Sequence, residues 1–338
     1  MTRRTGRPAG AWVATTVLSL ALAGCRGNQV IFNPQGPAAR DIAQLGWFLF
    51  AVCGVVYAMV LVALAWALLR RRREDDQGAG ATRAITRTVA LATAVTAALL
   101  VVLAATSVTA GRGLTSPSGP GAITVDVIGH QWWWDFQYRD VTPSDVVSSP
   151  NELHIPVGVP VVLRAQSRDV IHSFWVPNLH GKRDLIPGVV TSLWIQADRP
   201  GVYRGQCAEF CGYQHAHMAM QVVAEPMDAF LAWIQRQRQP AGDPPDQEAL
   251  RGREVFLQSP CVSCHTVRGT IAGSRVGPDL THVGSRLTLA AGTLPNTRGH
   301  LAGWVADSQS VKPGNRMPPN VLTAGDLQAV LGYLRSLR

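Results

Sequence analysis

The chain contains 338 residues, which is enough for two or three domains rather than one hydrophobic core. Its formal net charge is +9 at pH 7, and arginine carries almost all of it because Lys182 and Lys312 are the only lysines. The run Arg70 to Arg73 borders an apolar stretch and lacks the interleaved aromatic residues of a single-strand binding surface. We therefore interpret this charge as a membrane-topology signal and expect no nucleic-acid partner.

The N-terminus has the pattern of an exported bacterial protein. A basic start precedes an apolar run from Ala11 to Ala23 and then small residues, which predicts a secretory signal peptide over residues 1–24. Leu22-Ala23-Gly24-Cys25 resembles a bacterial lipobox. We expect Cys25 to become the lipidated first residue of the mature chain, anchored in membrane lipid. A simple signal cleaved nearby, with Cys25 free, is the alternative.

Two uncharged apolar runs, 42–69 and 89–110, are each long enough to cross a hydrocarbon core, which takes about 20 residues. The short loop between them carries an excess of arginine, which indicates a cytoplasmic loop. Residues 25–115 are therefore predicted to hold an N-terminal segment and a two-helix transmembrane hairpin. The protein would be multi-pass in the bacterial cytoplasmic membrane, with everything after residue 110 on the outer face.

The texture of the chain changes after a linker rich in Gly, Ser and Pro from Gly111 to Gly121. Residues 120–225 contain short runs of β-branched and aromatic residues broken by Pro and Gly, a pattern typical of an all-β sandwich. The expected strands are 123–127, 152–155, 161–164, 189–195 and 218–223.

The densest cluster of metal-ligating residue types lies between Gly205 and Met218. It holds Cys207, Glu209, Cys211, His215 and Met218. Thiolates and a thioether are soft ligands that select copper, but a blue single-copper site needs only one cysteine. The second cysteine favours a pair of coppers bridged by both sulfurs, each with one imidazole and one weak axial ligand.

Half of that ligand set must come from elsewhere in the chain. His172 lies between two β-rich runs and can supply the second imidazole, and the backbone carbonyl of Glu209 can supply the remaining weak ligand. A disulfide between the two cysteines and a structural zinc site are the alternatives. The disulfide leaves the histidines and Met218 unexplained, and zinc has no use for a methionine.

A second module follows a break in the chain. Pro226 to Gln239 is expected to form a short amphipathic helix, and Pro240 to Pro245 a stiff linker, so residues 226–245 connect the two modules. In residues 246–338, Cys261-Val262-Ser263-Cys264-His265 is the attachment signature of one covalently bound c-type haem. A redox-active dithiol is the alternative reading of Cys-x-x-Cys.

The second axial ligand supports the haem interpretation. Met317 is the only methionine after residue 227, and a Met/His pair is the ligation of electron-carrier cytochromes c. Gly277-Pro278-Asp279-Leu280 and a closing helix from Thr323 to Leu337, with Thr323 as its N-cap, resemble small bacterial cytochromes c. An all-α, class I-like cytochrome c domain is therefore expected.

From the first membrane span to about residue 225, the chain resembles subunit II of haem-copper cytochrome c oxidases. The matching residues are Gly129-His130-Gln131-Trp132-Trp133-Trp134, Asp169-Val170-Ile171-His172-Ser173, Ile186-Pro187-Gly188 and the Cys207 to Met218 stretch, in the family's order. The resemblance implies a cupredoxin-like Greek-key sandwich holding a binuclear copper centre, called CuA. It also implies that the Glu209 carboxylate holds a Mg²⁺ shared with subunit I.

The tryptophan run offers a path for electrons. Strand alternation would put Trp132 and Trp134 on one face and Trp133 on the other. The resemblance implies that Trp132 is the residue through which electrons reach the copper pair, whereas simple packing of all three rings is the alternative. Asp169 is expected either to hold a ligating imidazole or to cap a turn. The remaining histidines, His130, His154, His180 and His217, are expected to have no role in the site.

Fusion of a haem module to a copper module makes electron delivery intramolecular, with a high effective concentration. The predicted function is to pass electrons from the chain's own haem to CuA and on to the haem of subunit I, where oxygen is reduced to water and protons are translocated. Expected partners are oxidase subunit I, other oxidase subunits and an external donor, either cytochrome c or a quinol-oxidising complex. The alternatives are a subunit of a nitric oxide reductase, a quinol oxidase subunit, and a non-catalytic membrane-tethered copper-binding protein.

Overall fold

The computed structural model describes residues 29–69, 79–115, 121–139 and 146–338. It divides into two compact units, Arg40–Ser116 and the rest of the chain, which are described separately. The predicted signal peptide, the lipidation of Cys25 and the arginine run from Arg70 to Arg73 lie outside the described residues.

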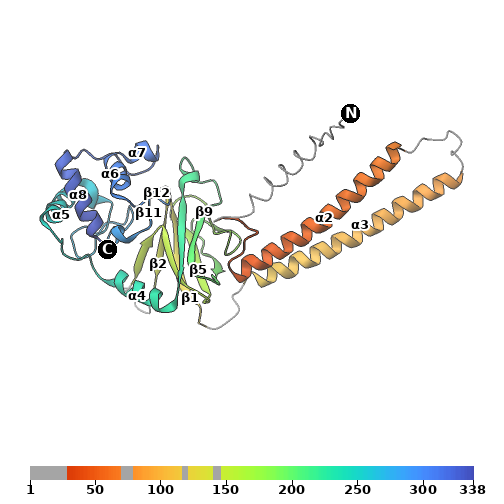
Figure 1. Ribbon diagram of the computed structural model, residues 1–338, viewed down its shortest axis with the longest axis horizontal. Coiled ribbons are helices and arrows are strands. Elements are labelled where there is room, and N and C mark those ends of the chain that lie inside the picture. Colours follow the sequence, from red (N-terminus) through yellow and green to blue (C-terminus); the bar gives the residue numbers. More distant parts are fainter. Residues whose placement is uncertain (1–28, 70–78, 116–120, 140–145) are drawn as a thin grey trace, which may run out of the picture. The chain divides into compact units, whose positions relative to one another are not determined.

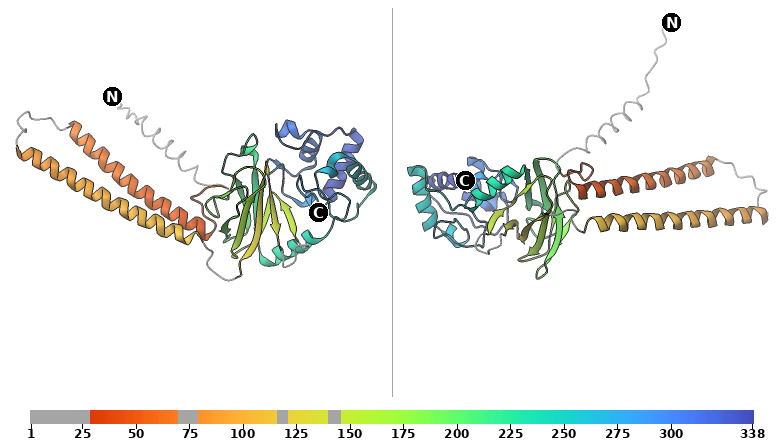
Figure 2. Two further views of the ribbon diagram at one scale, coloured as in Figure 1. Left: turned by 180° about the vertical axis from the view of Figure 1, so that it is seen from behind. Right: turned by 90° about the horizontal axis from the view of Figure 1, so that it is seen from below.

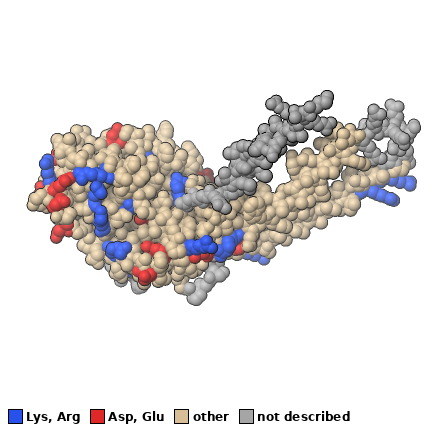
Figure 3. All heavy atoms as spheres, viewed as in Figure 1, with Lys and Arg blue, Asp and Glu red and all other residues tan. Residues whose placement is uncertain are grey.

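The first unit consists of helices α2 (Pro37–Leu69) and α3 (Ala79–Gly113), which run in opposite directions (Figures 1 and 2). Both are long and apolar enough to cross a membrane, and most of their length presents neither acidic nor basic side chains to the outside (Figure 3). Large apolar side chains such as Leu68 and Leu69 are exposed, as lipid-facing residues would be. The two predicted apolar helices are thus confirmed, although α3 continues to Gly113 and overlaps the start of the predicted linker.

The second unit contains a β-sandwich of two five-stranded sheets. One sheet has the order β3-β2-β1-β5-β8 and the other the order β4-β10-β9-β6-β7 (Figure 1). The strands are β1 (Ile123–His130), β2 (Trp133–Tyr138), β3 (Val147–Pro150), β4 (Glu152–Pro156), β5 (Val161–Ser167), β6 (His172–Trp175), β7 (Arg183–Leu185), β8 (Thr191–Ile195), β9 (Gly201–Cys207) and β10 (Ala219–Glu225). Pairs β1/β5 and β4/β10 are parallel, and the other pairs are antiparallel. The predicted cupredoxin-like sandwich is confirmed.

The five predicted strands correspond to β1, β4, β5, β8 and β10, but alternation alone did not predict β3, β6, β7 or β9. Strands β3, β6 and β7 have at most four residues, too few for a period of two to be recognisable. Strand β9, Gly201–Cys207, carries glycine, arginine and glutamine among its residues, so its alternation is weak.

The sandwich core packs aromatic rings edge to face beneath the cysteine-rich loop. Trp134 and Phe174 have centroids 6.1 Å apart, and Phe136 and Phe174 6.3 Å apart, all three completely buried. Such pairs are favoured by the ring quadrupoles in addition to the area they bury. This rigid floor supports the ends of β6 and β9, where the predicted ligands lie.

The C-terminal part, residues 246–338, has its own hydrophobic core, centred on Phe256, Tyr333 and Leu331. Its helices are α5 (Gln247–Gln258), α6 (Arg298–Ala306), α7 (Ser308–Val311) and α8 (Ala324–Ser336), together with a small β11/β12 hairpin (Thr288–Leu289 and Leu294–Pro295). Helices α5 and α8 approach so closely that a Cβ at Gly252 would collide with the backbone of Ala329. As predicted, the hydroxyl of Thr323 accepts from the Asp326 amide and caps α8.

Helix α4 (Met227–Arg238) follows the sandwich, as the sequence predicts, and covers a buried charged cluster. The ring of His154 stacks on Trp233, with centroids 4.0 Å apart. Its two nitrogens lie 3.0 Å from Glu152 Oε1 and 2.9 Å from Glu225 Oε1. Burial opposes the charged imidazole, but hydrogen bonds to the two carboxylates outweigh it, so the pKa of His154 is raised above its ordinary value.

We therefore expect the stability of this unit to fall as pH rises. Charged His154 stabilises the folded state fully below its unfolded pKa of about 6.5, and this contribution is lost as pH rises through the raised folded pKa. His154→Gln should destabilise the protein by about 1.5–3 kcal/mol at low pH, the scale of charged hydrogen bonds, and should flatten the pH dependence. Thermal unfolding followed from pH 6 upwards tests this, and an unchanged slope in the variant would contradict it.

Candidate metal centre and haem attachment site

The predicted ligands come together at one end of the sandwich. His172, Cys207 and Cys211 are buried, and one ligand atom from each lies within 4.8 Å of the others. Strand β6 begins at His172 and β9 ends at Cys207, and because the two strands pair antiparallel these ends are neighbours. The following loop folds back to His215 and Met218 before β10 begins.

The two sulfurs are surrounded by all the other predicted donors. Cys207 Sγ lies 3.8 Å from Cys211 Sγ, 3.9 Å from His172 Nδ1 and 3.2 Å from the carbonyl oxygen of Glu209. Cys211 Sγ lies 3.7 Å from His215 Nδ1 and 3.8 Å from Met218 Sδ. The structure therefore places two imidazoles, one thioether and one carbonyl oxygen within 4 Å of one or the other of two neighbouring thiols.

This donor set fits copper better than the alternatives. Cys207 and Cys211 are free thiols, not a disulfide. The buried thioether of Met218 among the donors is a soft ligand that structural zinc sites do not use. Two thiolates between two imidazoles and two weak donors match the chemistry of a copper pair.

The close contact of the two thiols shifts their pKa values in opposite directions. The sulfur–sulfur contact lowers the pKa of Cys207 to about 3, with the His172 ring contributing in the same direction and burial opposing it. The same contact raises the pKa of Cys211. The first proton is thus lost easily and the second is retained, so a cation binding both sulfurs must displace that second proton.

The carboxylate of Asp169 contacts both the His172 ring and backbone amides of nearby turns, as the two predicted roles each require. Its Oδ1 lies 2.8 Å from His172 Nε2, which leaves Nδ1 facing Cys207. Its Oδ2 accepts from the Gln131 amide at 2.7 Å. Burial opposes ionisation, but these hydrogen bonds outweigh it and lower the pKa of Asp169 to about 2. A carboxylate in this position fixes the tautomer and orientation of the ring.

Gly129 explains how His172 fits against the opposite sheet. A Cβ at this position would lie 2.8 Å from His172 Cδ2 and 3.2 Å from Leu185 Cδ2. Only glycine leaves room for the imidazole at this crossing of the two sheets.

The three tryptophans do not alternate along one strand, and that prediction was wrong. Trp132 lies in the turn before β2, so only Trp133 and Trp134 belong to the strand. Trp134 is core, and Trp133 stacks on His130 with centroids 4.2 Å apart. Trp132 instead points to the loop from Cys207 to Met218, where its Nε1 donates to the Cys211 carbonyl at 2.9 Å. Trp132 also packs against the edge of the sandwich core, so its ring combines packing with a hydrogen bond to the Cys211 backbone.

The carboxylate of Glu209 points away from the sulfurs. It is half exposed, and its Oε2 lies 3.4 Å from Lys182 Nζ. The residue thus presents its carbonyl to Cys207 and its side chain to the surface, the two directions that the prediction requires.

The haem attachment residues lie on and after a short 3-10 helix, Pro260–Ser263. Cys261 and Cys264 are free and half buried, and His265 Nδ1 lies 2.8 Å from the carbonyl oxygen of Pro278. A Cβ at Gly277 would lie 2.8 Å from His265 Cε1. The carbonyl fixes one ring nitrogen and leaves Nε2 for an iron, so these residues fit a covalent haem.

Met317, the predicted second axial ligand, is held by hydrogen bonds to its backbone. The Met317 amide donates to Asn315 Oδ1 at 2.7 Å, and its carbonyl accepts from Ser308 Oγ at 2.6 Å and Gln309 Nε2 at 2.8 Å. The Met317 side chain is half buried. The loop is fixed while its side chain stays available, as an axial ligand requires.

Sequence reasoning missed two residues beside the site. Lys312, in residues 246–338, is buried, and its ammonium donates to the backbone carbonyls of Trp132 and His217. Burial lowers its pKa to about 8. Gln131 donates to the same Cys211 carbonyl as Trp132, at 2.8 Å. A clue to Lys312 existed, since it is one of only two lysines in an arginine-rich chain. Gln131 lies in the Gly129 to Trp134 stretch that carries the family resemblance, but no role was predicted for it.

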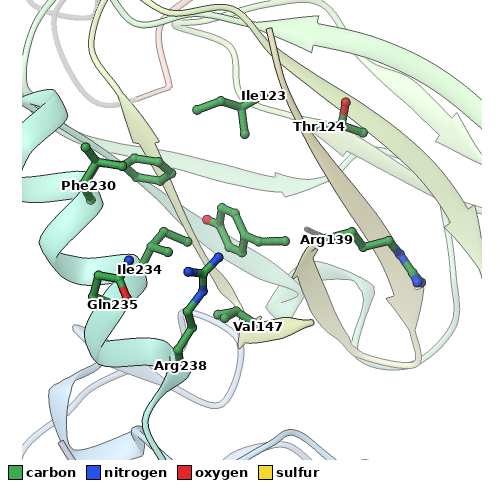
Figure 4. A pocket seen from close by; sticks show the side chains of 10 residues that line it. Ile123, Thr124, Arg139, Val147, Phe230, Ile234, Gln235 and Arg238 are labelled. Carbon is green, nitrogen blue, oxygen red and sulfur yellow. The ribbon is translucent and has the colours of Figure 1, made fainter. Parts of the chain in front are cut away.

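A pocket of about 350 Å³ opens elsewhere, between the sandwich and α4 (Figure 4). Its lining includes the apolar side chains of Phe230 and Ile234 and the arginines Arg139 and Arg238. None of the predicted site residues lines it. It is separate from the donor cluster.

Family models match both modules. Residues 144–225 match "Cytochrome C oxidase subunit II, periplasmic domain", and residues 249–338 match "Cytochrome c". The chain is 35% identical over 345 residues to cytochrome c oxidase subunit 2 of Alkalihalophilus pseudofirmus, covering 98% of each protein. It is 27% identical over 231 residues to quinol oxidase subunit 2 of Bacillus cereus, covering 66% of this chain and 78% of that protein.

Among solved structures, the periplasmic domain of cytochrome oxidase subunit II from Bradyrhizobium japonicum is 28% identical, with a TM-score of 0.33, and covers 35% of this chain and 96% of its own. The similarity to the Alkalihalophilus protein extends through the membrane helices, the sandwich and the haem module. The chain therefore belongs to the cytochrome c oxidase subunit II family and carries a fused cytochrome c domain.

Proposed function

We propose that this protein is the electron-accepting subunit of a respiratory cytochrome c oxidase, passing electrons from its own c-type haem to a CuA centre and on to the haem of subunit I. The observation that carries the proposal is the cluster of two buried thiols with two imidazoles, one thioether and one carbonyl oxygen around them, with Trp132 hydrogen-bonded to the Cys211 backbone. When bound, the copper pair and the haem each supply reversible one-electron chemistry.

The residues proposed to hold the copper pair have distinct tasks. Cys207 and Cys211 would hold both coppers through their sulfurs, His172 and His215 would supply the imidazoles, and Met218 with the carbonyl of Glu209 would supply the weak donors. The carboxylate of Asp169 holds the His172 ring in one orientation. Since these groups are already in place, little reorganisation accompanies a change of charge at the site.

The residues proposed to hold the haem are Cys261 and Cys264 through thioethers, with His265 and Met317 as axial ligands. The hydrogen bond at the Pro278 carbonyl raises the basicity of the His265 ring. A thioether and an imidazole as the two protein ligands would favour the reduced iron and raise its potential, which suits a carrier that accepts electrons from an external donor.

Trp132 is proposed as the residue through which electrons reach the copper pair. Its indole Nε1 is linked by one hydrogen bond to the backbone of a bridging cysteine, which makes a short covalent and hydrogen-bonded path to the sulfur. Trp133 stacks on His130. Trp134 is completely buried, with its Nε1 3.4 Å from the Met218 carbonyl and its ring against His172, so it has no exposed surface to meet a donor. Trp132 combines a partly exposed ring with a hydrogen bond to the backbone of a cysteine.

The proposed setting follows from the same family membership. The two apolar helices would cross the bacterial cytoplasmic membrane, with both redox domains on its outer face. Subunit I would receive the electrons and reduce oxygen while protons are translocated, and other oxidase subunits would complete the enzyme. The exposed carboxylate of Glu209 would contribute to a Mg²⁺ site shared with subunit I, in place of its pairing with Lys182.

A nitric oxide reductase could use the same copper centre, so the accepted gas must be measured. The purified intact complex, supplied with a reductant, should consume oxygen and leave nitric oxide largely unreduced. Preferential nitric oxide consumption would assign the subunit to the other enzyme. A copper-delivery protein would release its copper rapidly to a mild chelator, whereas the buried donor cluster predicts slow release.

Trp132→Phe should slow electron transfer to the copper pair without removing copper. The substitution deletes the indole donor to the Cys211 carbonyl, whereas the six proposed ligands remain. Stopped-flow reduction followed at the copper absorbance should be at least about tenfold slower. Trp133→Phe is the matched control, and equal rates in the two variants would remove Trp132 from the path.

Cys211→Ser should abolish the copper pair, because it removes one of the two sulfurs proposed to hold both coppers. One sulfur cannot bridge two coppers as two do, so the spin shared over two copper nuclei should disappear from the electron-spin spectrum and the copper content should fall from two per chain. Cys53→Ser is the control, because Cys53 is an exposed thiol in α2. Retention of a shared-spin signal in Cys211→Ser would contradict the proposed ligand set.

A further inference from the structure

The surface around Trp132 is covered by the chain's own haem domain, residues 246–338. Its Lys312 is only 2% exposed. The Lys312 ammonium donates to the carbonyl oxygens of His217 at 2.8 Å, Ala290 at 3.1 Å and Trp132 at 3.4 Å. Its three N–H donors thus meet three backbone acceptors. One of these is the carbonyl of Trp132 itself, and another, that of His217, belongs to the loop from Cys207 to Met218, here called the copper loop.

The β11/β12 hairpin makes a second contact beside the first. The Ala219 amide donates across to the Ala291 carbonyl at 3.0 Å. A Cβ at Gly292 would lie 2.9 Å from Ala219 Cβ, and Gly292 has φ of +75°, so the hairpin tip requires glycine here. Ala219 directly follows Met218, which means the haem domain touches the end of the copper loop.

The loop leading to Met317 makes a third contact. Gln214 Nε2 donates to the Pro313 carbonyl at 2.6 Å. The guanidinium of Arg316 donates to Gln131 Oε1, and Gln131 Nε2 donates to the Cys211 carbonyl at 2.8 Å. Residues 312–317 therefore connect the proposed haem ligand to the proposed copper ligand by hydrogen bonds on both sides of Trp132.

We propose that Lys312 is a positioning residue that latches the haem domain over Trp132, so that the attached domain, and not a donor from solution, delivers electrons at this surface. This inference rests on the proposed function. In each transfer one electron leaves the reduced haem iron and one is gained by the copper pair, with no bond made or broken. External donors would then reduce the haem first.

The latch differs from the charged docking of separate redox proteins. The acceptors of Lys312 are neutral carbonyls, and the ammonium is shielded from solvent. Salt screens exposed charges strongly and buried ones much less. Transfer between the two domains of the intact protein should therefore be nearly independent of ionic strength.

Lys312→Met in the intact oxidase tests the latch. Methionine keeps much of the apolar length but removes all three hydrogen bonds and leaves the carbonyls unpaired. After rapid reduction of the haem by a photo-excited ruthenium complex, transfer to copper should slow by about tenfold, the effect of a tenfold weaker docking equilibrium. Soluble cytochrome c should now reduce copper directly, with a rate that falls as salt rises from about 0.01 to 0.5 M.

Hydrogen exchange gives a reading that does not depend on electron transfer. The Ala219 amide donates across the domain boundary, so in Lys312→Met it should exchange at least about tenfold faster. Arg251→Met, which removes an exposed charge of the haem domain that pairs with Asp326, is the control and should behave as wild type. Gly292→Val should reproduce the Lys312→Met behaviour from the other side of the contact.

The inference is overturned if transfer, salt dependence and Ala219 exchange in Lys312→Met all match Arg251→Met. It is equally overturned if soluble cytochrome c reduces copper directly in the wild-type protein. Resting spectra separate this result from failure of the proposed function, because loss of the haem or copper signals from the wild-type protein would refute the cofactors and not the latch.

Discussion

The structure depends on two thiols held 3.8 Å apart in a buried loop at the end of a rigid sandwich. Alone, two sulfurs in this position compete for one proton, and the contact shifts their pKa values in opposite directions. The groups around the sulfurs are arranged to bind a cation there in place of that proton. Imidazole and thioether donors lie close to the sulfurs, and Asp169 fixes the His172 ring. A loop without a scaffold could not hold six donors in this arrangement.

The scaffold achieves this through strand pairing and one small residue. The antiparallel pairing of β6 and β9 brings His172 and Cys207, 35 residues apart in sequence, to the same place. Gly129 on the opposite sheet leaves space for the imidazole. The buried rings of Trp134 and Phe174 pack against each other beneath the loop and so support it from the core side.

Sequence patterns predicted the chemistry better than the geometry. The Cys207 to Met218 spacing and Cys261-x-x-Cys264-His265 are dense, local signals, and the long apolar runs and the Thr323 cap of α8 are equally local. Trp132 was assigned to a strand because alternation cannot show where a turn ends. Lys312 could not be assigned at all, since its role arises from carbonyls of Trp132 and His217, whose approach depends on tertiary packing.

Fusion of the two modules gives more than proximity. A tether raises the effective concentration of a donor, but the contacts of Lys312, the β11/β12 hairpin and Gln131 hold one orientation of the haem domain against the copper loop. The central claim of this account remains the sulfur-bridged metal pair. The most direct test is the electron-spin spectrum of the oxidised wild-type protein: we predict one unpaired spin shared equally by two copper nuclei, and a mononuclear copper signal or a colourless zinc-loaded protein would contradict it.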